Sequence, residues 1–187
     1  MISLELGTKM GTKKGIALAQ FGQMLGYPAS GHNEYLERLA SSVESAYPES
    51  KKTLQQFTTA MAEKSLGEQE ELFTRTFDLA AICSLYVTGY IFGDENFDRG
   101  TLMSILGDKY AELGYNTNGE LPDHLSILLV FASWIDEEAL NELIQFCLLQ
   151  PVTEMVDRLK DSDNPYFFLL SSVLVVLKTD LPGGTRS

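Results

Sequence analysis

Glu120, Leu121, Pro122, Asp123 and His124 form the run of this sequence whose residue types could carry chemistry. Two carboxylates stand beside one of the chain's two histidines, as they would in an acid–base pair or in a polar binding site. Proline favours the first turn of a helix, where its missing N–H removes no hydrogen bond. Asp123 would then face the positive end of the helix dipole. The run therefore predicts a helix that begins at Pro122, with polar side chains gathered at its start.

The groups that an enzyme would need are otherwise missing from the sequence. No Gly-x-x-x-x-Gly-Lys phosphate loop, Gly-x-Gly-x-x-Gly fingerprint or Gly-x-Ser-x-Gly elbow occurs. No glutamate precedes a histidine by three residues, as a di-iron helix bundle requires, and the cysteines and histidines fit no common zinc-ligand spacing. We therefore expect no enzyme, no metal and no cofactor. His124 acting with Asp123 as acid or base is the alternative that stays open.

A second run, from Phe73 to Tyr90, combines aromatic residues with charged ones. Aromatic residues at helical spacing are typical of core packing. The stripe is also wide, so part of it could instead line a groove that accepts an amphipathic or basic peptide. Carboxylates at the rim of such a groove would accept hydrogen bonds from an arginine. The predicted peptide-binding residues are Phe73, Phe77, Asp78, Leu85, Tyr86, Tyr90, Glu120, Leu121, Pro122, Asp123 and His124.

Charge and composition limit the partners. The 187 residues carry 26 acids and 14 bases, a formal net charge of −12, and 44% of them are hydrophobic. Such a charge disfavours nucleic acid and suits a cationic partner, or it only keeps the protein soluble. The free thiols Cys83 and Cys147 lie in apolar patterns and indicate a reducing compartment, the cytoplasm. The uncharged run 166–177 would make about 18 Å of helix, too short for a hydrocarbon core of about 30 Å.

Helical periodicity accounts for nearly the whole chain, and no long alternating run favours a sheet. We expect an all-α, single-domain bundle of about seven to nine helices over residues 15–180, with flexible tails at 1–14 and 181–187. Pro151 should kink or split the longest late helix. The expected helices cover residues 16–25, from Ser30 or Asn33 to 46, 48–61, 68–90, 97–113, 122–133, 136–160 and 164–178.

Several short motifs follow one another in a fixed order: Phe73-Thr74-Arg75-Thr76-Phe77-Asp78, Ser84-Leu85-Tyr86, Gly93-Asp94, Asp98-Arg99-Gly100 and Glu120-Leu121-Pro122-Asp123-His124-Leu125. This ordered set resembles the nitrate reductase delta-subunit family of molybdoenzyme assembly chaperones, the NarJ type, which is related to the TorD and DmsD type. The chain departs from the family pattern in two places. Thr76 stands where the family often has Leu, and Phe73 where it commonly has Tyr, so no role for a phenol hydroxyl is carried over.

The resemblance implies an all-α chaperone without enzymatic activity. Such proteins bind the N-terminal segment of a molybdopterin oxidoreductase's catalytic subunit and assist insertion of the molybdenum cofactor. Our hypothesis is that a helix from Phe77 to Tyr90 and the helix start at Pro122 line one peptide groove. Gly93, Arg99 and Gly100 would shape the turn between the helices, with Arg99 paired to a carboxylate.

Some questions stay open at this point. The alternative function is that of a non-catalytic structural subunit of a multi-subunit complex. The chain could be a monomer or a homodimer, and the molybdoenzyme that it would serve is not specified by the sequence. Insertion into a membrane and binding of nucleic acid are not expected.

Overall fold

The computed structural model describes residues 11–79, 81–93 and 97–179. Within these ranges the chain is helical apart from turns and one isolated β-bridge, so the predicted all-α fold class is confirmed. Because α8, a π-helical turn (Ile144–Leu148) and α9 are continuous, the described residues form nine helical units, at the upper end of the expected number. The helices are α1 (Lys13–Met24), α2 (His32–Ala46), α3 (Lys51–Ala62), α4 (Leu66–Phe77), α5 (Thr88–Phe92), α6 (Phe97–Leu113), α7 (Leu125–Phe131), α8 (Glu137–Leu143), α9 (Leu149–Leu159) and α10 (Tyr166–Lys178).

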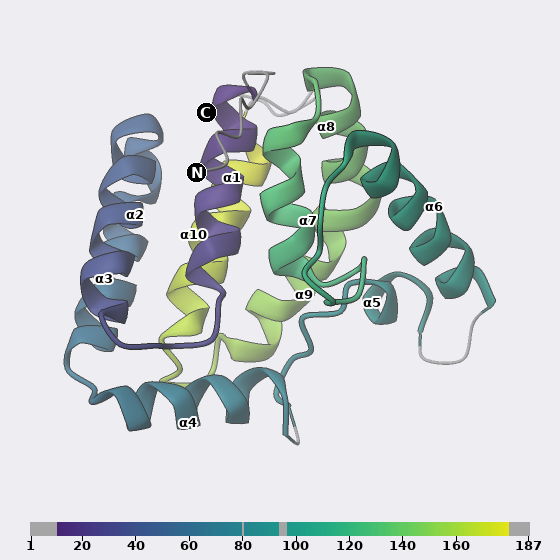
Figure 1. Ribbon diagram of the computed structural model, residues 1–187. Coiled ribbons are helices and arrows are strands. Elements are labelled where there is room, and N and C mark those ends of the chain that lie inside the picture. Colours follow the sequence, from purple (N-terminus) through teal and green to yellow (C-terminus); the bar gives the residue numbers. More distant parts are fainter. Residues whose placement is uncertain (1–10, 80, 94–96, 180–187) are drawn as a thin grey trace, which may run out of the picture.

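Helices α1 and α10 run through the middle of the bundle (Figure 1). α2 and α3 lie on one side of them, and α7, α8 and α9 lie on the other. α1 packs against α2, α7 and α10, while α10 also packs against α3 and α9. α4 crosses one end of the bundle, and α6 is the outermost helix on the far side (Figure 1).

The contact between α1 and α7 depends on glycine. A Cβ atom at Gly15 would lie 2.3 Å from the carbonyl oxygen of Ala132, and one at Gly22 would lie 2.7 Å from that of Ser126. Both distances are far below van der Waals contact, so only a residue without a side chain lets the two backbones approach this closely. The hydroxyl of Thr12 caps α1 by accepting from the N–H of Gly15.

The prediction that Pro151 disturbs the late helix is correct. Pro151 lies in the first turn of α9, directly after the π-helical turn Ile144–Leu148. Proline cannot donate to the carbonyl group one turn earlier, and its ring clashes with that carbonyl group. The wider π turn relieves this clash, and the N–H of Leu149 bonds to the carbonyl of Ile144, five residues back.

The long helix expected over residues 68–90 is wrong. α4 ends at Phe77, and the described residues between it and α5, which begins at Thr88, are not helical. Residues 83–87 alternate between buried and half-buried side chains, as in an extended strand rather than a helix. No glycine or proline marks the end of α4, so the break has no local sequence signal.

The apolar run at the C-terminal end of the chain forms α10, and its side chains are largely buried in the core. Within the described ranges, no helix is long and apolar enough to cross a bilayer. Cys83 and Cys147 are both free and buried, as expected for small core residues. α1 begins at Lys13, so the last two residues of the predicted N-terminal tail are helical. Residues 1–10 of that tail and the tail 181–187 lie outside the described residues.

Candidate functional site

The two sequence motifs that were singled out meet in space, through their backbones. Leu85–Val87 and Asp123–Leu125 cross as a short antiparallel bridge that pairs Tyr86 with His124. The N–H of Val87 donates to the carbonyl of Asp123 over 3.0 Å, and the N–H of Leu125 donates to that of Leu85 over 2.7 Å. Extended backbone therefore joins the motifs where two helices were expected.

Pro122 does not begin a helix, contrary to the prediction. α7 starts three residues later, at Leu125, with His124 in the N-cap position. Pro122 lies in the preceding turn, which the N–H of His124 closes by donating to the carbonyl of Leu121. The carbonyl of Pro122 accepts from the hydroxyl of Tyr110 on α6 over 2.8 Å, and this contact fixes the turn against the fold.

Asp123 points inward, and its side chain is only 1% exposed. Its Oδ2 accepts from both the hydroxyl and the backbone N–H of Thr88, the first residue of α5. Arg99 donates through Nε to the Thr88 hydroxyl over 3.2 Å, so the guanidinium reaches Asp123 through that hydroxyl. We had expected Asp123 to meet a basic residue of a partner. Its burial excludes that contact in this conformation, and its role is to hold two segments together.

The other side of the crossing carries Tyr86, Glu120 and His124. The hydroxyl of Tyr86 donates to Glu120 Oε1 over 3.1 Å, and the N–H of Leu121 donates to the same oxygen over 2.9 Å. The Tyr86 ring packs edge-on against the His124 ring, with centroids 5.2 Å apart. All three side chains are half-buried, so this face keeps contact with solvent.

Burial lowers the pKa of His124, while the charges of Glu120, Asp123 and Asp78 oppose this by raising it. Burial and then the charge of Glu120 raise the pKa of Tyr86, with a smaller contribution from Asp78. The charges of the same three carboxylates thus act on both rings. His124 Nδ1 bonds to the Ser126 hydroxyl over 2.7 Å. Among the described residues no hydrogen bond joins the side chains of His124 and Asp123, so the open acid–base alternative gains no support.

The aromatic stripe is mostly core, the first of the two interpretations offered above. Phe73 and Phe77 of α4 are buried against Tyr166 of α10, with ring centroids 6.0 and 4.7 Å away, and Leu85 is buried as well. Tyr90 is half-buried, and its hydroxyl donates to the carbonyl of Ser84 over 2.8 Å. Phe73, Phe77 and Leu85 are therefore not available to a partner in this conformation.

The accessible part of the predicted set is smaller. Asp78 and Leu121 are exposed, and Pro122 is half-buried like the rings described above. Sequence reasoning missed Leu79 and Ile82, which are 72% and 39% exposed in the irregular segment after α4. Because both residues were assigned to the apolar face of the expected helix 68–90, their exposure was not predicted. The signal that could have revealed the segment is the alternation of Cys83, Leu85 and Val87 with more polar neighbours.

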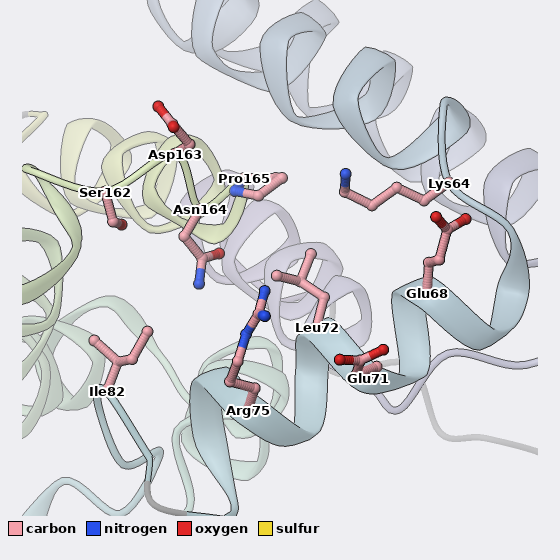
Figure 2. A pocket seen from close by; sticks show the side chains of 10 residues that line it. All are labelled: Lys64, Glu68, Glu71, Leu72, Arg75, Ile82, Ser162, Asp163, Asn164 and Pro165. Carbon is pink, nitrogen blue, oxygen red and sulfur yellow. The ribbon is translucent and has the colours of Figure 1, made fainter.

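A pocket of about 390 Å³ opens between α4 and the connection from α9 to α10, and Figure 2 shows its lining. Leu72 and Ile82 supply apolar surface, and the side chain of Arg75 points into the pocket from α4. Asn164 forms part of the wall and donates to the hydroxyl of Thr76 over 2.8 Å, which ties this wall to α4. We call this space the Arg75 pocket; Lys64, Glu68, Glu71, Ser162, Asp163 and Pro165 complete its lining.

A second, more open pocket of about 420 Å³ also borders α4 and shares Glu71 and Arg75 with the first. Its apolar lining includes Tyr27 and Leu79, and Glu70 adds a further carboxylate. The solvent side of α4 therefore combines exposed apolar side chains with an excess of acids.

Gly93 follows α5 with φ 77°, a left-handed conformation that favours glycine. Arg99 and Gly100, which we had expected in the same turn, lie inside α6. Arg99 acts through its bond to Thr88 and not by shaping a turn. No atom lies within 4 Å of a Cβ built on Gly100, so packing does not require glycine there.

Comparison with known proteins places these observations in context. The model of a family described as the nitrate reductase delta subunit matches residues 39–171. A protein of Bacillus subtilis (strain 168), assigned as the nitrate reductase molybdenum cofactor assembly chaperone NarJ, is 32% identical over 109 residues. That alignment covers 58% of this chain and 58% of the relative. The chain therefore spans little more than half of the relative's length.

Two further similarities differ in extent. The nitrate reductase-like protein NarX of Mycobacterium tuberculosis is 29% identical over 102 residues, which cover 54% of this chain and 15% of that protein. A crystal structure from Archaeoglobus fulgidus, assigned as a redox enzyme maturation protein, aligns with a TM-score of 0.61. The alignment covers 94% of this chain and 99% of the Archaeoglobus fulgidus chain, and 18% of the residues are identical. At that identity the similarity shows a shared fold and nothing more.

Proposed function

The chain belongs to the nitrate reductase delta subunit family, and from this premise we propose that it is an assembly chaperone, not an enzyme, of a molybdenum-containing oxidoreductase. In this role it binds the N-terminal segment of the catalytic subunit and assists insertion of the molybdenum cofactor. The observation that carries the proposal is the family match over residues 39–171, supported by the role assigned to the Bacillus subtilis relative. A nitrate reductase-like enzyme is the partner that we propose, in the cytoplasm.

The accessible surface between α4 and α7 has the chemistry that such a segment needs. Leu79, Ile82 and Leu121 are exposed apolar residues, and Leu79 and Leu121 directly follow the carboxylates of Asp78 and Glu120 in the sequence. An amphipathic segment could bury its apolar side chains there and place its basic side chains against the acids. The charges of Asp78 and Glu120 both act to raise the pKa of Tyr86 and of His124, which supports placing the two carboxylates on one patch. We call these five residues, with Tyr86 and His124, the acidic patch.

The pockets beside α4 extend this surface. The Arg75 pocket includes Ile82, and the more open pocket includes Leu79, so each contains one apolar residue of the acidic patch. Together they form a longer path along α4 on which an extended or helical segment can lie. The mixed charges of Arg75, Glu71 and Asp163 along this path would favour a segment with acids as well as bases.

The decisive experiment compares two forms of the catalytic subunit. The affinity-tagged chain is used to capture the subunit from cells that make the molybdenum cofactor and from cells that cannot. A chaperone should retain the cofactor-free subunit and release the loaded one. Stable retention of the loaded enzyme would instead identify a structural subunit of the complex and would refute the proposal.

A further inference from the structure

The guanidinium of Arg75 has no acidic partner in the part of the chain that the structure describes. Glu71 precedes Arg75 by four residues, the spacing at which an acid and an arginine on one helix commonly pair. No ion pair joins the two side chains, both of which belong to the described residues. Arg75 instead extends into the Arg75 pocket, as Figure 2 shows. Its N–H donors therefore remain available to an acceptor from outside the chain.

A second cation faces the same space. The ammonium of Lys64 extends into the pocket from the connection between α3 and α4 (Figure 2). Glu68 is engaged elsewhere, because its Oε2 accepts from the N–H and the hydroxyl of Ser65 at the start of α4. These bonds from Ser65 lower the pKa of Glu68 more than the charge of Lys64 does. The carboxylate of Asp163 points away from Arg75 (Figure 2), so the inward-facing charges are positive.

The wall of the pocket opposite Arg75 is attached to α4 by a buried amide. Asn164 is 7% exposed, and its Nδ2 donates to the hydroxyl of Thr76 while its Oδ1 accepts from the N–H of Tyr166 over 3.0 Å. Both ends of this amide are thus occupied, and the pocket is formed before a ligand binds. α10 begins at Tyr166, directly after the residues of this wall, and the positive end of its dipole favours an anion there.

We propose that the Arg75 pocket receives the carboxylate of an aspartate or glutamate in the partner's N-terminal segment, an inference that rests on the proposed function. Charge complementarity and position favour this occupant. The guanidinium can bind both oxygens of a carboxylate. Ile82 belongs both to this pocket and to the acidic patch, so a segment whose basic side chains lie on the patch can reach the pocket with an acidic one. The acid then fixes the register in which the segment lies.

Isothermal titration calorimetry tests this with the N-terminal peptide of the catalytic subunit that the tagged chain retains. Arg75→Gln should weaken binding about three- to fivefold, as for an ion pair that keeps contact with solvent. The direction is diagnostic, because the loss of a positive charge from a protein of net charge −12 should by itself strengthen the attraction of a basic peptide. Arg38→Gln removes the same charge from an exposed position on α2 and should not weaken binding.

Matched changes in the peptide identify the group that Arg75 meets. Each aspartate or glutamate of the peptide is replaced in turn by asparagine or glutamine. One of these peptides should bind the parent protein about three- to fivefold more weakly, and Arg75→Gln should cause no further loss with that peptide. Arg75→Glu should recover binding when the peptide carries lysine at the same position. Arg75 is exposed, so these substitutions leave the core intact.

The outcomes separate this inference from the proposed function. If the peptide binds but Arg75→Gln does not weaken binding, or if the two losses add for every peptide, the inference is wrong and the proposed function stands. If the parent protein binds no peptide of the subunit, the proposed function fails and the inference fails with it. Inorganic phosphate at constant ionic strength is the probe for a free anion. Saturable phosphate binding that Arg75→Gln abolishes would assign the pocket to a free anion and overturn the inference.

Discussion

The hydroxyl of Thr88 donates to the carboxylate of Asp123, and this bond joins two segments that lie 35 residues apart in the sequence. A buried carboxylate is costly unless donors meet it, and here the donors meet Oδ2, while no partner is found for Oδ1 among the described residues. Thr88 supplies two donors, its hydroxyl and its backbone N–H, and its hydroxyl accepts in turn from Arg99. The start of α5, the turn before α7 and the first part of α6 are thus connected through one small side chain.

We expect Thr88→Val to lower the free energy of unfolding by about 1–3 kcal/mol. Valine keeps the shape of threonine but leaves the buried Asp123 without the hydroxyl donor. Urea denaturation followed by circular dichroism measures the change. Thr59→Val is the matched control, because Thr59 is exposed and no side-chain hydrogen bond is found for it within the described ranges. Equal stability of the two variants would contradict a structural role for the Thr88 hydroxyl.

Glu120→Gln should weaken binding of the catalytic subunit's N-terminal segment by up to about fivefold, as an exposed ion pair contributes about 0.2–1 kcal/mol. The glutamine can still accept from Tyr86 and Leu121, so the substitution removes charge without disturbing the turn. Isothermal titration calorimetry with a synthetic peptide of that segment gives the affinity. Binding by the parent protein should also weaken as salt is added.

The control for this experiment is Glu37→Gln, which removes the same charge from an exposed position on α2. It should bind the peptide like the parent protein. If both variants lose affinity to the same extent, the net charge of −12 is responsible and not the acidic patch.

Gly15→Ala and Gly107→Ala should change stability in opposite directions. The added methyl group at Gly15 would clash with the backbone of Ala132, and we expect a loss of about 1–3 kcal/mol. Gly107 lies inside α6 with no atom within 4 Å of its Cβ position, so alanine should stabilise that helix by about 0.5–1 kcal/mol. Thermal unfolding of the two variants side by side tests the pair. A stable Gly15→Ala protein would mean that α1 and α7 can separate without cost.

Burial raises the pKa of both Cys83 and Cys147 from 9.0 to about 11. The unfolded chain therefore loses these two protons at lower pH than the folded chain. The two protonated thiols therefore contribute fully to the free energy of unfolding below about pH 9, and this contribution is lost as the pH rises to about 11. At about pH 8 the native thiols should react slowly with a disulfide reagent, and both should react rapidly in urea. Rapid reaction of either thiol in the native protein would show that its surroundings open easily.

Much of the fold could be predicted from the sequence because its helices are bounded by local signals. Gly26-Tyr27-Pro28 separates α1 from α2, Pro48 opens the turn before α3, and Gly114 follows α6. The end of α4 has no such signal. The bonds of Leu85 and Val87 to residues 123–125 hold residues 85–87 extended, and such distant pairing cannot be seen in a local pattern.

The sequence predicted that the two motifs meet, but it did not predict which of their side chains face solvent. The motif at Tyr86 does lie against the motif at His124. Which side chains face solvent depends on the extended backbone there, since each step along a strand reverses the side. Asp123 therefore turned inward to Thr88, while Tyr86 and Glu120 stayed at the surface.

The π-helical turn before Pro151 determines the direction in which the side chains of α9 point around the helix axis. One surplus residue advances a helix by about 100° around its axis. With that advance, Gln150 donates to the carbonyl of Tyr90 over 3.2 Å, and the Arg158 guanidinium lies 4.8 Å from the centroid of the Tyr90 ring. Deleting a single residue from 144–148 would swing both side chains away from α5. The π-helical turn that accompanies Pro151 thus positions the two side chains, Gln150 and Arg158, that contact Tyr90.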